Sequence, residues 1–177
     1  MKLTNLSASL LAISLGGVSG LANADGYIGF GIGTASYDYS DINDSSAFLV
    51  YGGYLPANSI LGVEVAYVDM GKASITSLPG WSLNVSGLNV SAIVSSAAVS
   101  SQPLYFFAKL GYYNFSNDLN PTGLSDSGGG LSWGLGMGYK FSRQFSMRGE
   151  VQGFSGVRDF ANDSDVPLIN LGVTYHF

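Results

Sequence analysis

The chain of 177 residues contains no cysteine, which excludes a disulfide framework and any thiolate chemistry. Charged residues make up only 11% of it, well below the roughly 25% of a typical soluble domain. After residue 24 there is no apolar run of about 18 residues, which excludes a membrane-spanning helix. The sequence therefore has too little charge to cover a water-exposed surface and no helical span. A β-barrel in lipid resolves this conflict, because the outer wall of such a barrel carries no charge.

The first residues have the pattern of a secretory signal peptide. Lys2 supplies a positive start, residues 10–15 lie in a short apolar region, and the small-x-small sequence at 22–24 is a cleavage site. The apolar region is too short and too rich in Gly and Ser to span a membrane. We therefore expect residues 1–24 to be cleaved and residues 25–177 to form one mature domain. Without Lys2 the mature domain has six basic and twelve acidic residues.

The remaining sequence alternates with the period of two that is typical of β-strands, and no 3.6-residue period competes with it. We expect eight strands, at 26–37, 47–55, 59–69, 83–98, 103–115, 130–141, 145–157 and 166–177. Three connectors are tight, at 56–58, 100–102 and 142–144, and four are longer, at 38–46, 70–82, 116–129 and 158–165. Short periplasmic turns and long external loops are the pattern of outer-membrane barrels. The prolines lie in connectors or at the first residues of strands, at Pro56, Pro79, Pro103, Pro121 and Pro167.

The two faces of the predicted strands differ sharply, as strand 130–141 shows. One face carries Leu131, Trp133, Leu135, Met137, Tyr139 and Phe141, and the other carries Ser132, Gly134, Gly136, Gly138 and Lys140. A soluble, lipocalin-like barrel would place the apolar face inside, but the opposite face is too poor in charge to be a water-exposed surface. Small residues suit the narrow interior of an eight-stranded barrel. We predict an all-β fold, an eight-stranded antiparallel up-and-down transmembrane β-barrel whose apolar wall faces lipid and whose last strand pairs with the first. The stretch 48–51 is apolar on both faces and leaves its orientation open.

Four local sequences in this order, at 62–67, 108–112, 148–154 and 171–177, resemble the transmembrane domain of outer-membrane protein A and its small-barrel relatives. The resemblance covers essentially all of the mature domain. It implies a Gram-negative outer-membrane location, contact with membrane lipids and lipopolysaccharide, and a monomeric state. It also implies that the C-terminal strand, with Tyr175 and Phe177, carries the signal that the barrel-assembly machinery recognises.

The same resemblance implies a charged network inside the barrel. Glu64 matches an acid of the family's third strand, Lys109 a base of the fifth, and Arg148 and Glu150 the Arg-x-Glu of the seventh. Lys140 lies on an inward face as well. Buried charges need partners, and we expect Glu64 to pair with Arg148 and Lys109 with Glu150. Such a network either fills a narrow lumen or, if its pairs rearrange, gates an ion path.

Catalytic and cofactor motifs are not convincing. Gly29, Gly31 and Gly33 have the spacing of a nucleotide-binding loop, but they alternate inside a strand and do not open a helix. The one histidine, His176, shares a face with Thr174, and no matching acid is evident for nucleophilic catalysis. We expect no enzyme activity, no cofactor, no metal centre and no nucleic-acid partner.

The predicted outer loops are acidic, with Asp38, Asp41, Asp44, Asp118, Asp126, Asp159, Asp163 and Asp165 against Lys72 and Arg158. They are either simply solvated or hold divalent cations near lipopolysaccharide. Aromatic and apolar loop residues offer surface contacts, at Tyr37, Tyr39, Leu78 and Trp81. We expect a structural outer-membrane protein with a side-chain-filled lumen. The alternatives are a surface adhesion, host-interaction or resistance protein and, third, a narrow ion pore.

Overall fold

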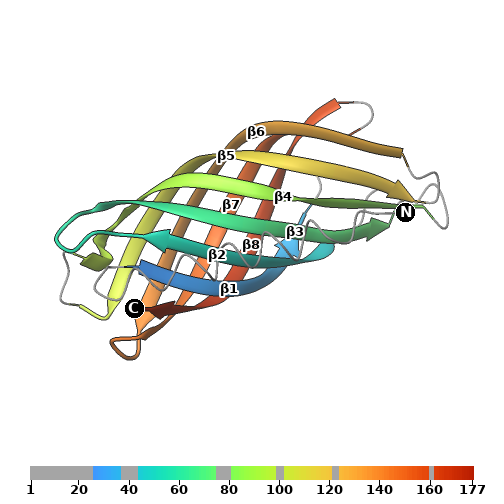
Figure 1. The fold of residues 1–177 in the computed structure, drawn as a ribbon. Helices are drawn as coiled ribbons and strands as arrows, with labels where there is room; N and C mark the ends of the chain where they lie inside the picture. The colour runs from blue at the N-terminus through green and yellow to red at the C-terminus, as the bar shows by residue number, and fades with distance from the viewer. Residues whose placement is uncertain (1–25, 37–43, 75–80, 99–101, 121–123, 160–161) are drawn as a thin grey trace.

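The structure is a computed structural model that describes residues 26–36, 44–74, 81–98, 102–120, 124–159 and 162–177. Its strands form a closed antiparallel barrel (Figure 1). The strands are β1 (Gly26–Ala35), β2 (Ser45–Tyr54), β3 (Leu61–Ser74), β4 (Ser82–Ser95), β5 (Leu104–Asn120), β6 (Leu124–Lys140), β7 (Phe145–Asp159) and β8 (Asn162–His176). A short 3₁₀ helix, η2 (Ser96–Ala98), follows β4. The predicted fold class and strand number are confirmed. No helix in the described ranges has the length and apolarity to cross a membrane.

Closure of the barrel occurs between the first strand and the last. The β1–β8 ladder runs from the pair Tyr27 and His176 to the pair Ala35 and Leu168. All the other ladders join neighbours in sequence. Closure joins the two edges of the sheet, and unpaired backbone groups at an open edge would cost several kcal/mol each in hydrocarbon. The prediction that strand eight pairs with strand one is confirmed.

The two ends of the barrel differ. The tight connectors at 56–58 and 142–144 and the C-terminus lie together at the left of Figure 1. At the opposite end two of the predicted loops are shorter than expected. Strand β5 continues to Asn120 and β6 begins at Leu124, and likewise β7 continues to Asp159 and β8 begins at Asn162. These outer rungs are rich in Ser, Asn, Asp and Gly. They lack an apolar face and so escape a search for alternation, although backbone pairing does not require one.

Two local predictions are wrong. Residues 96–98, expected to end a strand, form the 3₁₀ helix η2. Pro167, expected at the start of a strand, lies inside β8, which begins at Asn162. The Pro167 carbonyl accepts the Ser36 N–H at 2.9 Å, just beyond the last β1–β8 pair. The missing proline N–H therefore costs β8 one hydrogen bond at a point where β1 ends, which is an edge position that tolerates proline.

The predicted faces of the strands are confirmed. Leu135 and Met137 of β6 are 59% and 53% exposed on the outer wall. The ambiguous stretch 48–51 is also resolved, since Phe48 points outward and Leu49 and Tyr51 are buried inside. At the tight-turn end the outer wall carries a row of contacting aromatic rings, Phe141, Phe145, Tyr175 and Phe177, with successive ring centroids 6.1, 5.2 and 5.4 Å apart. Aromatic belts of this kind mark the interface between membrane and water.

We predict that Leu135→Arg lowers the free energy of unfolding in lipid vesicles by about 2–4 kcal/mol, because it places a charge on the lipid-facing wall near the midplane. Gln144→Arg, at an exposed position of a tight turn, is the matched control and should change stability little. Denaturant unfolding of both variants measures the difference. Equal stability of the two variants would contradict the orientation assigned to β6.

Candidate functional site: the barrel interior

Four charged side chains meet inside the barrel in the half nearer the tight turns. They come from three strands: Glu64 from β3, Lys109 from β5, and Arg148 and Glu150 from β7. Lys109 Nζ lies 2.9 Å from Glu64 Oε1 and 2.6 Å from Glu150 Oε1. Arg148 Nη1 lies 2.6 Å from Glu64 Oε2, and Arg148 Nη2 lies 3.4 Å from Glu150 Oε2. Two positive and two negative charges are thus paired out of contact with solvent, and the network has no net charge.

Glu64 is the centre of this network. Its carboxylate accepts hydrogen bonds from the Tyr27 hydroxyl at 2.9 Å, from Lys109 Nζ at 2.9 Å, and from Arg148 Nη1 and Nη2 at 2.6 and 3.1 Å. A carboxylate offers about four acceptor positions, so all of them are used. The Arg148 contact is bidentate, which is the strongest geometry for this pair. The contacts of Glu150 are ion pairs by distance alone.

Local sequence explains how four charges fit inside a narrow barrel. Arg148 and Glu150 are two residues apart and so share the inner face of β7. The adjacent strand β6 opposes them with Gly138 and Gly136. A Cβ atom at Gly134 would lie 2.5 Å from Glu150 Oε1. Glycine on the inner face of β6 therefore leaves the space that the network occupies.

Aromatic rings complete the surroundings of the network. The Arg148 guanidinium carbon lies 3.5 Å from the centroid of the Tyr51 ring and 5.2 Å from that of Phe107, within the range of cation–π attraction. The Tyr51 hydroxyl is 2.8 Å from the Thr174 hydroxyl. The Arg148 side chain is therefore held on its planar face as well as at its terminal nitrogens.

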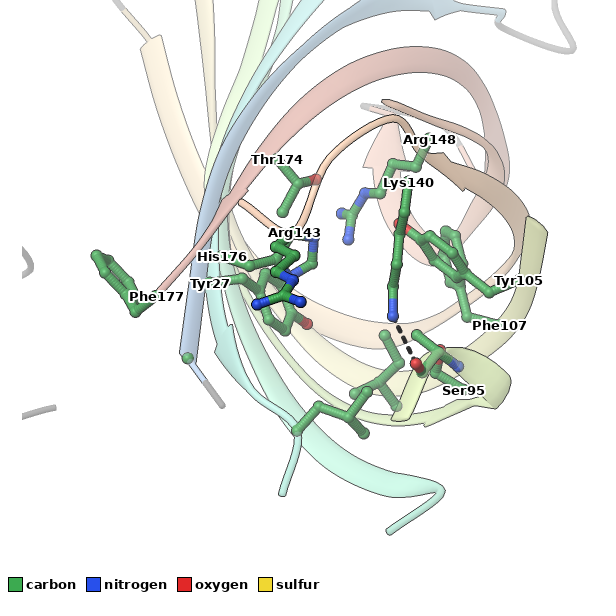
Figure 2. A pocket seen from close by; sticks show the side chains of 14 residues that line it. Tyr27, Ser95, Tyr105, Phe107, Lys140, Arg143, Arg148, Thr174, His176 and Phe177 are labelled. Atoms are coloured by element: carbon green, nitrogen blue, oxygen red, sulfur yellow. Dashed lines mark hydrogen bonds between the residues drawn. The ribbon is translucent and has the colours of Figure 1, made fainter. Parts of the chain in front are cut away.

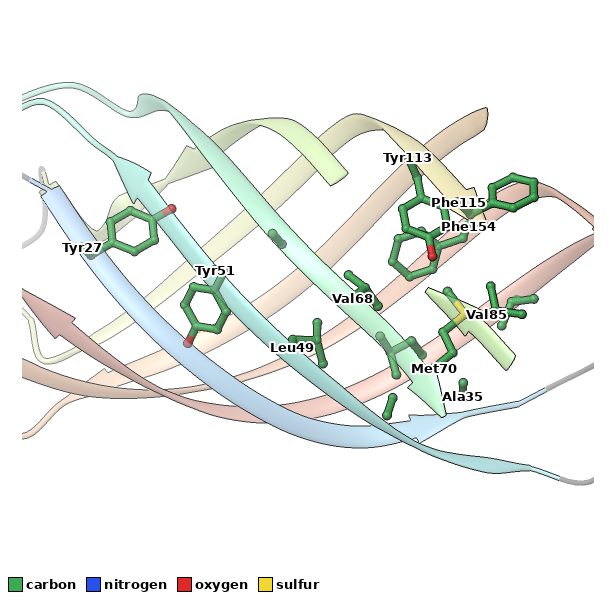
Figure 3. Close-up of a cluster of buried hydrophobic side chains, with 14 residues drawn as sticks. Tyr27, Ala35, Leu49, Tyr51, Val68, Met70, Val85, Tyr113, Phe115 and Phe154 are labelled. Atoms are coloured by element: carbon green, nitrogen blue, oxygen red, sulfur yellow. The ribbon is translucent and has the colours of Figure 1, made fainter. Parts of the chain in front are cut away.

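The outer half of the interior is apolar. Buried side chains from seven strands fill it, and Figure 3 shows them continuing from the level of Tyr51 toward the outer end of the barrel. The Tyr113 ring packs on Phe154 and Phe115 with centroid separations of 4.7 and 5.7 Å. The cluster also contains Leu49, Val68, Met70, Val85, Val166 and Leu168. Sequence analysis missed this layer, because it expected mostly small and charged residues inside. The sequence signal that could have revealed this layer is a stretch that is apolar on both faces, such as 48–51.

The structure corrects the prediction that Lys140 belongs to the charged network. It is the last residue of β6, one inward position beyond Gly138, and it lies at the tight-turn end of the lumen. Its Nζ donates to the Ala97 carbonyl of η2 at 2.6 Å and lies 5.8 Å from the Tyr105 ring centroid. Within the described part of the chain Lys140 pairs with no carboxylate. Lys140 opposes Ser146 across the β6–β7 ladder, whereas Glu150 opposes Gly136, two inward positions away.

A cavity of about 220 Å³ opens at this end of the barrel. Figure 2 shows the side chains around it, with Lys140 and Arg143 near the mouth and Arg148 behind them. Its other walls come from the start of β1 and the end of β8, which pair with each other, and from η2 and β5. The lining residues are Gly26, Tyr27, Leu55, Ile93, Ser95, Ala97, Tyr105, Phe107, Lys140, Arg143, Arg148, Thr174, His176 and Phe177.

His176 contacts a serine that sequence analysis did not consider. Its Nε2 lies 2.9 Å from the Ser146 hydroxyl, which is also 3.2 Å from the Tyr105 hydroxyl. Thr174, the partner considered from sequence, bonds to Tyr51 instead. Ser146 is fully buried, and no carboxylate among the described residues bonds to His176, so the arrangement is a packed hydrogen-bond chain. The described residues also contain no cluster of three side chains suited to a metal ion.

The remaining predicted positions that the structure describes lie at the two ends of the barrel. Tyr175 and Phe177 point outward at the tight-turn end. Trp81 is half-buried just before β4 at the other end. The other predicted contact residues, Tyr37, Tyr39 and Leu78, lie outside the described residues. Of the predicted loop acids, Asp44 is exposed, and the side chains of the others are not described.

Comparisons with a family model and with solved structures identify outer-membrane β-barrels. The family model for the outer membrane protein beta-barrel domain matches residues 8–177. Neisserial surface protein A is 18% identical with a TM-score of 0.62 over 86% of this chain and 97% of that one. OprG from Pseudomonas aeruginosa is 13% identical with a TM-score of 0.62 over 87% and 96%. At these low identities, the TM-scores and coverages show a shared fold alone.

A third solved structure has the same fold. The attachment invasion locus protein Ail of Yersinia pestis, in complex with the heparin analogue sucrose octasulfate, is 17% identical with a TM-score of 0.58, over 87% of this chain and 97% of that one. No curated protein matches the chain.

We predict that Arg148→Ala destabilises the barrel by about 3–5 kcal/mol, because two buried carboxylates are left with Lys109 alone. Lys72→Ala removes an exposed charge at the other end of the barrel and should change stability by less than about 0.5 kcal/mol. Denaturant unfolding in the same detergent or vesicle measures both. Similar stability of the two variants would contradict a stabilising role of the buried network.

Proposed function

The chain belongs to the family of outer membrane protein β-barrel domains, and from this premise we propose that it is a structural scaffold with a closed lumen and surface-displayed hairpins. It resides in the outer membrane, and its apolar wall contacts lipid. In this role the barrel is a monomer that catalyses no reaction and holds no cofactor.

The observation that best supports a closed lumen is that two different layers of side chains fill it. The charged layer around Glu64 has no net charge, so it offers no fixed charge to attract an ion. The apolar layer around Tyr113 and Phe154 lies in series with it. A hydrophobic constriction resists wetting and so blocks ions even where side chains move. Eight strands leave an interior just wide enough for side chains, which supports the same conclusion.

We predict that the purified protein is silent in planar bilayers and that Glu64→Ala is silent too, because the apolar layer remains when the charged layer is disrupted. Insertion is verified by the mobility shift between unboiled and boiled samples in SDS gels. Discrete conductance steps in the unmodified protein, with an amplitude that changes in Glu64→Ala, would contradict the closed lumen and support the pore alternative.

A second candidate function is contact with macromolecules outside the cell. A tilted strand needs about 9–11 residues to cross the bilayer, and β5 and β6 have 17 residues each. The surplus of roughly six residues, at about 3.3 Å each, extends this hairpin by about 20 Å. Such a hairpin supports a display role. Trp81, with the loop residues Tyr37, Tyr39 and Leu78, supplies the proposed contacts.

The charge at the outer end bears on the kind of partner. Ail carries a sulfated heparin analogue in its solved structure. Here the predicted loops are dominated by aspartate, with Lys72 and Arg158 as their bases. This balance does not favour a polyanion, and it supports either an aromatic-mediated contact or divalent cations shared with lipopolysaccharide.

We predict that the outer hairpin can be shortened without loss of the barrel. Replacing residues 117–126 by Asn-Gly joins Ser116 to its directly paired partner Ser127 through a two-residue turn that suits a β-hairpin. The heat-dependent gel shift should be unchanged, because the membrane rungs are intact. Adhesion of expressing cells to host-cell monolayers should fall. Adhesion equal to that of the unmodified protein would remove support for the display role.

Export and assembly complete the proposal. We propose that cleavage after Ala24 releases the mature domain into the periplasm. The outward position of Tyr175 and Phe177 on the final strand supports their recognition by the barrel-assembly machinery. Both rings are already held in the aromatic row on the outer wall, so they also have a packing role in the finished barrel.

A further inference from the structure

The cavity at the tight-turn end has an unusual charge balance. Acidic residues outnumber basic ones by 12 to 7 in the chain, yet three of the seven bases line this cavity and, among the described residues, no Asp or Glu does. These bases are Lys140, Arg143 and Arg148. In an outer-membrane barrel the short turns face the periplasm, so the cavity opens toward the periplasm.

The positive charge at the mouth is not cancelled from below. Arg148, at the back of the cavity, is paired with Glu64 and Glu150, and Lys109 balances the second of these acids. The four charges sum to zero, which leaves Lys140 and Arg143 as a net charge of two. Neither residue forms an ion pair within the part of the chain that the structure describes.

The C-terminal carboxylate forms no ion pair with Lys140 or Arg143. Phe177 borders the cavity, but its side chain points to the outer wall, as Figure 2 shows. Its carboxylate forms no ion pair with a described base. The Phe177 N–H instead continues the ladder by donating to the Gly26 carbonyl at 3.0 Å.

Both bases still have free donors. Lys140 Nζ donates one N–H to the Ala97 carbonyl, and an ammonium group has three N–H donors. Arg143 is exposed in the β6–β7 turn, and its planar guanidinium can bind two oxygens of one anion. The two residues belong to one hairpin and lie near the mouth of the cavity in Figure 2. A concave site of one charge sign with low-dielectric walls concentrates oppositely charged ligands.

We propose that this periplasmic cavity is a binding site for a phosphate group, with Lys140 and Arg143 as its principal ligands. A phosphate monoester carries a charge of about −1.5 to −2 near neutral pH, which matches the two unpaired bases, whereas a single carboxylate matches one. The cavity of about 220 Å³ has room for a phosphate group and a short substituent. His176 and the ring of Tyr105 form the adjoining walls.

The test uses the full barrel, folded in detergent micelles, titrated calorimetrically with inorganic phosphate and with glycerol 3-phosphate at low salt. We expect saturable binding that weakens as the salt concentration rises. The double variant Lys140→Gln/Arg143→Gln should lose at least about tenfold in affinity, since two charge-assisted contacts are removed. Lys72→Gln, at the opposite end of the barrel, is the matched control and should bind as the unmodified protein does. The heat-dependent gel shift verifies that each variant is folded.

A second measurement distinguishes a soluble source of phosphate from a lipid headgroup. Amide NMR shifts of residues 140–143 are compared between nanodiscs of phosphatidylcholine and nanodiscs that contain phosphatidic acid, whose headgroup is a phosphate monoester. Shifts specific to phosphatidic acid, lost in the double variant, would support the site and identify the lipid as its source. The proposal is overturned if the unmodified protein shows neither saturable binding up to tens of millimolar nor lipid-specific shifts. It is also overturned if the folded double variant binds as the unmodified protein does.

Discussion

Hydrogen bonding between β1 and β8 is the interaction on which the other features of this barrel depend. It satisfies the backbone groups that would otherwise face hydrocarbon, where each unpaired group costs several kcal/mol. Closure also divides every strand into an inner and an outer face. The outer face of the membrane rungs must then be apolar, as Leu135 and Met137 are. Charged residues on these rungs can only point inward, where each of them needs a partner.

The interior meets that requirement in layers. Glu64 uses all its acceptor positions on Tyr27, Lys109 and Arg148, which leaves a neutral charged layer. An apolar layer closes the outer half, and a positively charged cavity opens below at the periplasmic end. The separation of charge along the barrel axis connects the proposed functions. A neutral layer and an apolar layer in series disfavour conduction, and unpaired bases at the mouth favour anion binding.

Much of this architecture could be predicted from residue order. The period of two indicated the strands and their faces, and the tight connectors indicated which ends lie together. The errors share a physical origin. The outer rungs of β5 and β6 were missed because their Ser, Asn, Asp and Gly residues do not show the apolar alternation that marks a strand. The apolar inner layer around Tyr113 was missed because a strand that is apolar on both faces carries no sign of which face is inside.

Lys140 shows where prediction from the sequence ends. The alternation of residues along β6 was enough to determine that Lys140 points inward and that Leu135 points to lipid, because parity is a local property of a strand. Its partner was not determined in this way, because the stagger between strands sets the level of each side chain along the axis. Glu64 and Arg148 are 84 residues apart in sequence and 2.6 Å apart in space, while Lys140 lies two inward positions from Gly136, the residue that opposes Glu150. The sequence by itself determined which side chains share a face of each strand, because that alternation is local, and only the closed register of the barrel decided which inner side chains meet.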